Sequence, residues 1–153
     1  MKIFKSIPFL ILFLCSTLSL ESAQRSPQWD HVRKAYLKDH PICVICGTAK
    51  DLQVHHIKPF HLYPELELDP NNLFTLCTSK YWGFNCHLIA GHDGNFKWEN
   101  VHVAEDAARL HIIGSPQYIR EHGADERDEF IKEIRKRGKL ENAKSRNNQN
   151  YSQ

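Results

Sequence analysis

Two adjacent histidines, His55 and His56, stand in a short apolar run that ends at Pro59. Neighbouring side chains point to opposite faces of a β-strand, so this pair can reach one cleft only if the strand ends beside it. A neutral imidazole binds metal ions, and its unperturbed pKa of about 6.5 suits proton transfer near neutral pH. The pair therefore suggests one metal ligand and one general base. An arbitrary pair of histidines is more often structural, so the residues around this one decide the interpretation.

Four cysteines frame the histidine pair. Cys43 and Cys46 are separated by two residues and followed by Gly47, as in a zinc knuckle in which glycine permits a tight turn. Cys77 and Cys86 lie downstream and would complete a structural site of four thiolates, which leaves no coordination position open for chemistry. Two disulfides are the alternative, since the chain carries an export signal, but the spacing favours zinc.

The elements that must position these residues follow from periodicity and from start and stop signals. A strand is predicted from Asp51 to Ile57, followed by a loop from Pro59 to Pro70 and an apolar run from 73 to 77. A short helix is predicted from Cys86 to Gly91. Further helices are predicted at 27–39, 103–113, 116–122 and 126–137.

Composition and charge indicate one globular domain. The chain has 153 residues, of which 41% are hydrophobic and 25% charged. A net charge of +2 is too small to indicate nucleic-acid binding by itself. Between Lys132 and Arg146, however, seven basic residues stand against two acidic ones, a local charge of +5. This segment is either a phosphate-binding face or a solvated helix end.

The two ends of the chain are predicted to lie outside the fold. A basic start and an apolar run from Ile7 to Leu20 are typical of a signal peptide at 1–23, with cleavage after Ser22 or Ala23. A lipid anchor at Cys15 and a membrane anchor through residues 7–20 are the alternatives. The polar tail at 141–153 is predicted to be disordered.

Taken together, the cysteines, the histidine pair, Asn72 and the Cys86-His87 step resemble the HNH endonuclease family, in the subclass with a four-cysteine zinc site beside the active site. The resemblance implies a small α+β fold. Its ββα-metal (His-Me finger) core carries a structural zinc knuckle and is flanked by helices. The domain would span 24–140, with its motif core at 43–92. One departure is that Cys77 and Cys86 are nine residues apart, where the family usually has two residues between them.

The resemblance also implies roles for individual residues. His56 matches the general base, and Asn72 matches the residue that holds the loop and orients that base. His55 and His87 match the ligands of a catalytic divalent ion (Mg²⁺, Mn²⁺, Ni²⁺ or Zn²⁺), which is separate from the structural Zn²⁺. Two further candidates are His92, as an extra ligand, a phosphate contact or a turn residue, and His61, as a phosphate contact. The predicted nucleic-acid contacts are Lys58, Arg135, Lys136, Arg137 and Lys139.

The sequence therefore predicts an exported, metal-dependent endonuclease that hydrolyses phosphodiester bonds of DNA, with RNA as a second substrate and with low sequence specificity. No small-molecule cofactor is expected. The alternative is a catalytically inactive, zinc-stabilised module that binds nucleic acid. A disulfide-bonded secreted protein without enzymatic activity is the third hypothesis.

Overall fold

The protein is described here by a computed structural model of residues 24–150, with side chains described through residue 147. The predicted signal peptide, its alternatives as an anchor, and residues 151–153 of the predicted tail lie outside this range. Within it, no helix is both long enough and apolar enough to cross a bilayer. The elements in chain order are α1 (Trp29–Asp39), β1 (Leu52–His56), η1 (Pro64–Leu66), η2 (Pro70–Asn72), β2 (Leu73–Cys77), η3 (His87–Gly91), α2 (Val103–Ile113), α3 (Pro116–His122) and α4 (Asp125–Asn150).

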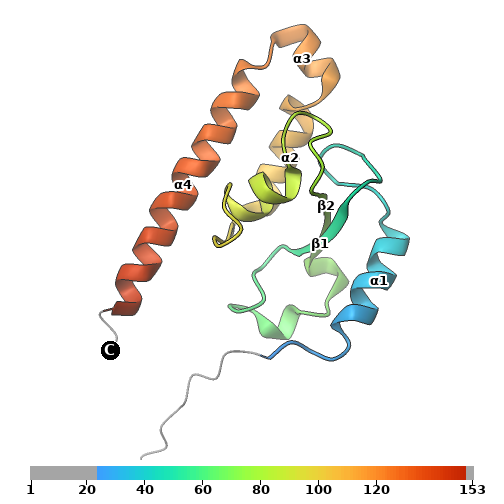
Figure 1. Cartoon of the computed structure of the whole chain (residues 1–153), viewed down its shortest axis with the longest axis vertical. Helices are drawn as coiled ribbons and strands as arrows, with labels where there is room; N and C mark the ends of the chain where they lie inside the picture. Colours follow the sequence, from blue (N-terminus) through green and yellow to red (C-terminus); the bar gives the residue numbers. More distant parts are fainter. Residues whose placement is uncertain (1–23, 151–153) are drawn as a thin grey trace, which may run out of the picture.

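An antiparallel hairpin lies at the centre of the molecule, with α1 on one side and α2 and the long α4 on the other (Figure 1). In its register, His55 lies opposite Phe74 and His56 opposite Leu73, so both histidines stand at the end of β1. The amide of Ile57 still donates to the carbonyl of Asn72 at 2.8 Å, after which the chain leaves the sheet. This arrangement confirms the predicted α+β class and the end of the strand beside the histidine pair.

The hydrophobic core lies between the hairpin and the helices η3, α2 and α4. The four cysteines belong to the same cluster as its apolar side chains, among them Ile45, Leu76, Ile89, Val103, Leu110 and Ile134. Helix α1 contributes no fully buried residue. It is attached to β2 instead by two hydrogen bonds, from Tyr36 Oη to the carbonyl of Leu73 at 2.7 Å and from Thr75 Oγ1 to the carbonyl of His40 at 2.9 Å.

Most element boundaries agree with the prediction, including those of α2 and α3. Helix α1 begins two residues later than predicted, because residues 26–29 form a turn closed by the amide of Trp29 on the carbonyl of Ser26 at 3.0 Å. The prediction of disorder from residue 141 is wrong for residues 141–150, which continue α4. Glu141, Ala143, Lys144 and Arg146 in this stretch are good helix formers, and Glu141 lies 3.5 Å from His102.

Candidate active site

The four cysteines of the described chain converge in the core. The sulfur atoms of these residues all lie within 4.8 Å of one another, and all four residues are buried: Cys43, Cys46, Cys77 and Cys86. None of them forms a disulfide, and the Sγ atoms of Cys46 and Cys77 are 3.5 Å apart. Burial, number and chemistry of these donors fit a structural zinc ion, which prefers four thiolates in a closed tetrahedral site.

The local backbone explains how the first cysteine pair is presented. Gly47 has a positive φ of +70°, and its amide donates to the carbonyl of Cys43 at 2.9 Å, which closes the tight turn. The amide of Val44 donates to the carbonyl of Thr75 at 3.0 Å, which fixes this turn to β2. Cys77 is the last residue of β2, so this strand both supplies the third cysteine and anchors the turn that carries the first two.

The nine-residue step from Cys77 to Cys86 is a loop that returns to the core. Phe84 is buried in the core cluster and Trp82 packs against it, whereas Tyr81 is 66% exposed. The loop ends at Cys86, which is the N-cap of η3. The departure from the usual spacing therefore leaves all four sulfurs in one cluster.

Ionisation of the thiols is uneven. A hydrogen bond from Cys86 lowers the pKa of Cys43 to about 5, whereas burial raises the pKa of Cys46 to about 12. The pKa of Cys86 is also raised, by its hydrogen bond to Cys43 and by burial. Several buried thiolates repel one another, so a bound divalent cation would compensate their charge.

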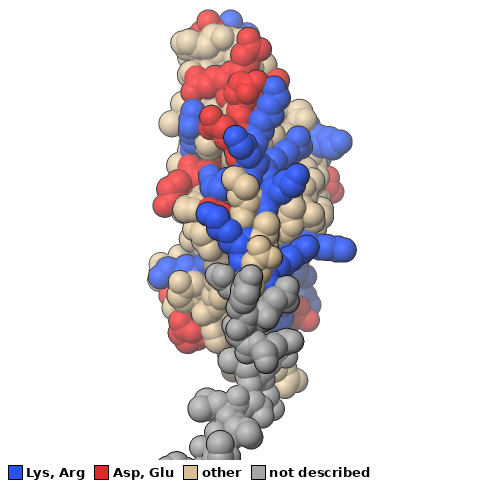
Figure 2. Space-filling view, turned by 90° about the vertical axis from the view of Figure 1, so that its left-hand side faces the viewer, with Lys and Arg blue, Asp and Glu red and all other residues tan. Residues whose placement is uncertain are grey.

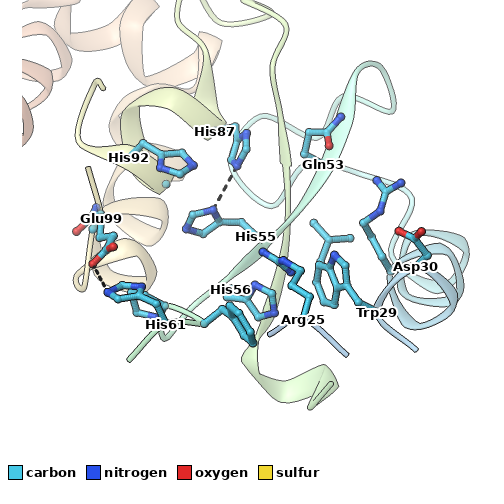
Figure 3. Close-up of a pocket in the computed structure, with 16 residues that line it drawn as sticks. Arg25, Trp29, Asp30, Gln53, His55, His56, His61, His87, His92 and Glu99 are labelled. Atoms are coloured by element: carbon cyan, nitrogen blue, oxygen red, sulfur yellow. Dashed lines mark hydrogen bonds and ion pairs between the residues drawn. The ribbon is translucent and has the colours of Figure 1, made fainter. Parts of the chain in front are cut away.

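A second cluster consists of His55, His87 and His92, which each offer a ring nitrogen within 4.8 Å of the others (Figure 3). His55 comes from β1, while His87 and His92 bracket η3. Nδ1 of His55 lies 3.2 Å from Nε2 of His87. Gly91 allows this approach, because a Cβ there would lie 3.0 Å from Cε1 of His55.

The geometry of η3 explains why His92 joins this cluster. His92 comes five positions after His87, and two residues at this spacing in an α-helix face different directions. Element η3 is a π-helix, in which backbone hydrogen bonds join residues five apart, so His87 and His92 face the same side. Nδ1 of His92 donates to the carbonyl of Trp98 at 2.8 Å, which directs Nε2 toward the cluster.

The protonation state of this cluster suits metal binding. Burial holds the pKa of His55 well below its usual range and lowers the pKa of His87 to about 4. The imidazoles of His55 and His87 are therefore neutral at pH 7, the form that coordinates a metal. Nδ1 of His87 is moreover buried without a hydrogen-bond partner among the described residues. Three clustered imidazoles are a donor set that fits a divalent transition metal.

His56 lies near the three clustered histidines but in a different environment (Figure 3). Its Nε2 lies 3.0 Å from the carbonyl of Glu67, which can only accept, so Nε2 carries the proton and Nδ1 keeps its lone pair. Its ring stacks on Trp29 with centroids 4.5 Å apart. Burial lowers the pKa of His56, so the ring stays neutral at pH 7. A neutral histidine with a free Nδ1 is suited to accept a proton.

The chain segment before α1 holds the carbonyl that orients His56. The carboxylate of Glu67 accepts from the amide of Ser26 at 2.8 Å and lies 3.5 Å from the guanidinium of Arg25. That guanidinium also lies over the rings of Trp29 and Phe60, at 4.9 Å from each. The sequence alone indicates no functional role for Trp29, Arg25 or Glu67.

Asn72 fastens the loop between the strands by three hydrogen bonds. Its Oδ1 accepts from the amide of Lys58 at 2.8 Å, and its Nδ2 donates to the carbonyls of Lys58 and Leu66, at 3.2 Å each. Leu66 immediately precedes Glu67. Asn72 therefore touches no part of the cleft directly and acts on His56 through the backbone of this loop.

A cleft of about 660 Å³ joins these groups (Figure 3). His56 and the three clustered histidines line it together with Arg25, Arg33, Trp29 and Phe60 on the side of α1. On the opposite side, Nε2 of His61 lies 2.8 Å from a carboxylate oxygen of Glu99. His61 thus faces the cleft, where its contact with Glu99 competes with the predicted contact to phosphate.

The predicted nucleic-acid contacts separate into two groups. Arg135, Lys136 and Lys139 are exposed on α4, whose outer face carries acidic residues near its start and Lys and Arg further along (Figure 2). Lys58 is exposed as well, but it does not line the cleft, and its Nζ lies 5.4 Å from the ring centre of Tyr63. The prediction for Arg137 does not fit the structure, because its guanidinium faces inward and pairs with Asp93 and Asp106.

The comparison with protein families agrees with this geometry. Residues 43–93, about a third of the chain, match the family described as HNH endonuclease. This segment contains the hairpin, η3, both residue clusters and His56, and it is therefore an HNH domain with a ββα-metal fold. No curated protein and no solved structure in the comparisons matches the chain.

Proposed function

We propose that this protein is a metal-dependent endonuclease that hydrolyses phosphodiester bonds of DNA, and of RNA as a second substrate. The observation that carries the proposal is the placement of a neutral His56, with Nδ1 free, in the same cleft as His55, His87 and His92. An HNH domain supports nuclease activity in general; the choice of substrate rests on the surrounding charges.

The three clustered histidines would hold the catalytic divalent ion. When bound, such an ion supplies Lewis-acid stabilisation of the charge that develops on the phosphate and on the leaving oxygen. Three protein ligands leave coordination positions for water and substrate, as a catalytic site requires. The four cysteines would hold a separate structural zinc, whose closed donor set leaves no such position.

The protein's own residues would carry the proton and orient the substrate. Nδ1 of His56 takes the proton of the attacking water, while the carbonyl of Glu67 keeps the other ring nitrogen protonated. A positioned base of this kind contributes about 10²–10⁴-fold to the rate. The guanidinium groups of Arg25 and Arg33 line the α1 side of the cleft, where they attract the phosphate backbone.

The exposed basic residues of α4 would extend contact along the nucleic acid. Arg135, Lys136 and Lys139 form no ion pair within the described residues and are free to contact phosphates. Phosphate contacts carry no sequence information, so specificity should be low and affinity should fall with salt. We also propose export through the signal peptide at 1–23, which N-terminal sequencing of the exported protein would test.

The test of this function is plasmid nicking by the chain beginning at Gln24. We expect nicking that EDTA stops and that Mg²⁺, Mn²⁺ or Ni²⁺ restores, with ends that DNA ligase can seal if they carry 5′-phosphate and 3′-hydroxyl groups. His31→Ala, which changes an exposed histidine outside the cleft, should cut like the unchanged protein. Tight binding of DNA and RNA without any cleavage would instead establish the inactive, zinc-stabilised binding module.

A second expected result concerns Trp29, whose ring stacks on His56. Replacing it by leucine removes the flat surface that sets the ring plane of the base. We expect kcat to fall by up to about 100-fold, as small misplacements of reacting groups do, with KM nearly unchanged. Steady-state kinetics on an oligonucleotide substrate would measure both.

Arg33→Met is the matched control, because Arg33 lies on the same helix and lines the same cleft but has no described contact with His56. It should raise KM, through lost attraction for phosphate, and leave kcat close to that of the unchanged protein. Equal effects of the two substitutions on kcat would contradict a positioning role for Trp29.

A further inference from the structure

Helix α4 packs directly on the turn that carries His92. The backbone of Gly138 lies against Asp93, and a Cβ at position 138 would come within 2.8 Å of the Cγ of Asp93. One turn earlier, the side chain of Arg135 lies over Gly94, where an added Cβ would be 2.7 Å from its Cγ. The residues that follow His92 are therefore enclosed by a helix outside the matched segment at 43–93.

The same contact contains an ion-pair network in which the partly exposed Arg137 meets two buried carboxylates. Arg137 donates to a carboxylate oxygen of Asp93 at 3.1 Å and to both oxygens of Asp106, which lies on α2. Nδ2 of Asn100 donates at 2.6 Å both to Asp106 and to the carbonyl of Ala90 in η3. Asp93 is fully buried and has a positive φ of +51°. Arg137 thus holds a strained turn at the end of η3.

An apolar contact would be the less costly way to join α4 to the core at this point. Buried ion pairs lose much of their attraction to desolvation, and their best-attested use is to select one arrangement over others. Here the arrangement that is selected is the path of the chain from His87 through His92 to Asp93. His92 is also restrained by its hydrogen bond to the carbonyl of Trp98, two residues before Asn100.

We propose that Arg137 and Gly138 are positioning residues that hold His92 in the metal-binding arrangement with His55 and His87. The proposal rests on the metal site of the proposed function and extends it to α4. Its consequence is that one segment of α4 presents Lys136 and Lys139 to nucleic acid on its outer side and aligns a metal ligand on its inner side.

The experiment is calorimetric titration of the zinc-loaded protein with Ni²⁺, without substrate, at a temperature where circular dichroism shows each variant folded. Arg137→Met should weaken Ni²⁺ binding about 10–100-fold, as loss of an outer-shell partner does. Arg137→Lys should weaken it less, because an ammonium keeps the charge but cannot bridge two carboxylates as a guanidinium does. Gly138→Ala should also weaken binding, by displacing Asp93. His92→Ala should remove this binding and so identify the site being titrated.

Lys136→Met is the control, with the same loss of charge at the neighbouring, exposed position. It should leave the Ni²⁺ affinity unchanged and raise KM for DNA. A folded Arg137→Met protein that binds Ni²⁺ like the unchanged protein, with only a lower melting temperature, would show a purely structural role and overturn the proposal. If Arg137→Met does not fold, Arg137→Lys decides by the same criterion.

The result is separable from that of the proposed function. If the unchanged protein cuts no nucleic acid but its Ni²⁺ affinity depends on Arg137, the nuclease proposal fails and the positioning role stands. If it cuts DNA while Ni²⁺ affinity is indifferent to Arg137 and Gly138, the positioning role fails alone.

Discussion

Replacing His56 by alanine is expected to abolish cleavage while leaving the fold and both metal sites intact. The side chain contributes no donor to the cluster of His55, His87 and His92, so Ni²⁺ affinity should be unchanged. What is lost is the lone pair of Nδ1 on a side chain that lines the cleft and whose Nε2 is bound to the carbonyl of Glu67. The rate should fall about 10²–10⁴-fold, the range for removal of a positioned base.

The comparison that makes this result specific is His61→Ala. His61 lines the same cleft from the loop that follows β1, but its ring is paired with Glu99 at 2.8 Å. We expect His61→Ala to change KM more than kcat, since the ring faces the substrate without an oriented, free nitrogen. Loss of kcat in His61→Ala with near-normal kcat in His56→Ala would reverse the assignment of the base. Initial rates of plasmid nicking and calorimetry with Ni²⁺ are the two measurements.

The part of this site that sequence could predict is the part encoded by local spacing. The Cys43–Cys46 turn needs only two sulfurs and Gly47 at positive φ, and this spacing is visible in the sequence. The pairing of His55 with His56 at a strand end is visible for the same reason, because Pro59 follows shortly after. Such features depend on backbone preferences over a few residues, and the structure reproduces them.

His92 shows where local spacing is not sufficient. A separation of five residues suggests different faces of an α-helix, and only the wider π-helical turn of η3 brings His92 beside His87. That turn is held by residues from later in the sequence. Asn100 donates a hydrogen bond to the carbonyl of Ala90, Arg137 pairs with Asp93, and Gly138 packs against Asp93. Contacts between segments so far apart in sequence leave no periodic signal.

Arg137 was misjudged for a related reason. In the sequence it belongs to a run of basic residues, and Arg135, Lys136, Arg137 and Lys139 of this run are predicted to contact nucleic acid. Helix geometry sends consecutive residues to different faces, so Lys136 faces outward while Arg137 faces the two buried carboxylates. Net charge describes a segment, but the function of each charge depends on which face of α4 it occupies.

Removing zinc is expected to have the largest effect on stability. The four cysteines lie inside the hydrophobic core and join the turn at Cys43 and the end of β2 to the start of η3. Without a cation, the site keeps four thiol groups buried together, and the pKa of Cys43 is lowered while that of Cys46 is raised. Structural zinc sites contribute about 10–16 kcal/mol of apparent binding free energy in zinc-finger peptides, which is comparable to the whole stability of a typical domain, about 5–15 kcal/mol.

We therefore expect a strong chelator, or Cys86→Ser, to cause cooperative loss of helical circular dichroism, which added Zn²⁺ reverses for the unchanged protein. His92→Ala is the matched control, because it should lose the catalytic ion and still melt like the unchanged protein. Zinc content near one equivalent and four reactive thiols after denaturation would account for the cluster. A chain that melts identically with and without chelator, and whose mass shows two disulfides, would establish the disulfide alternative instead. In that case η3 would be held to β2 by covalent bonds, and the folded protein would survive chelation with only its histidine site emptied.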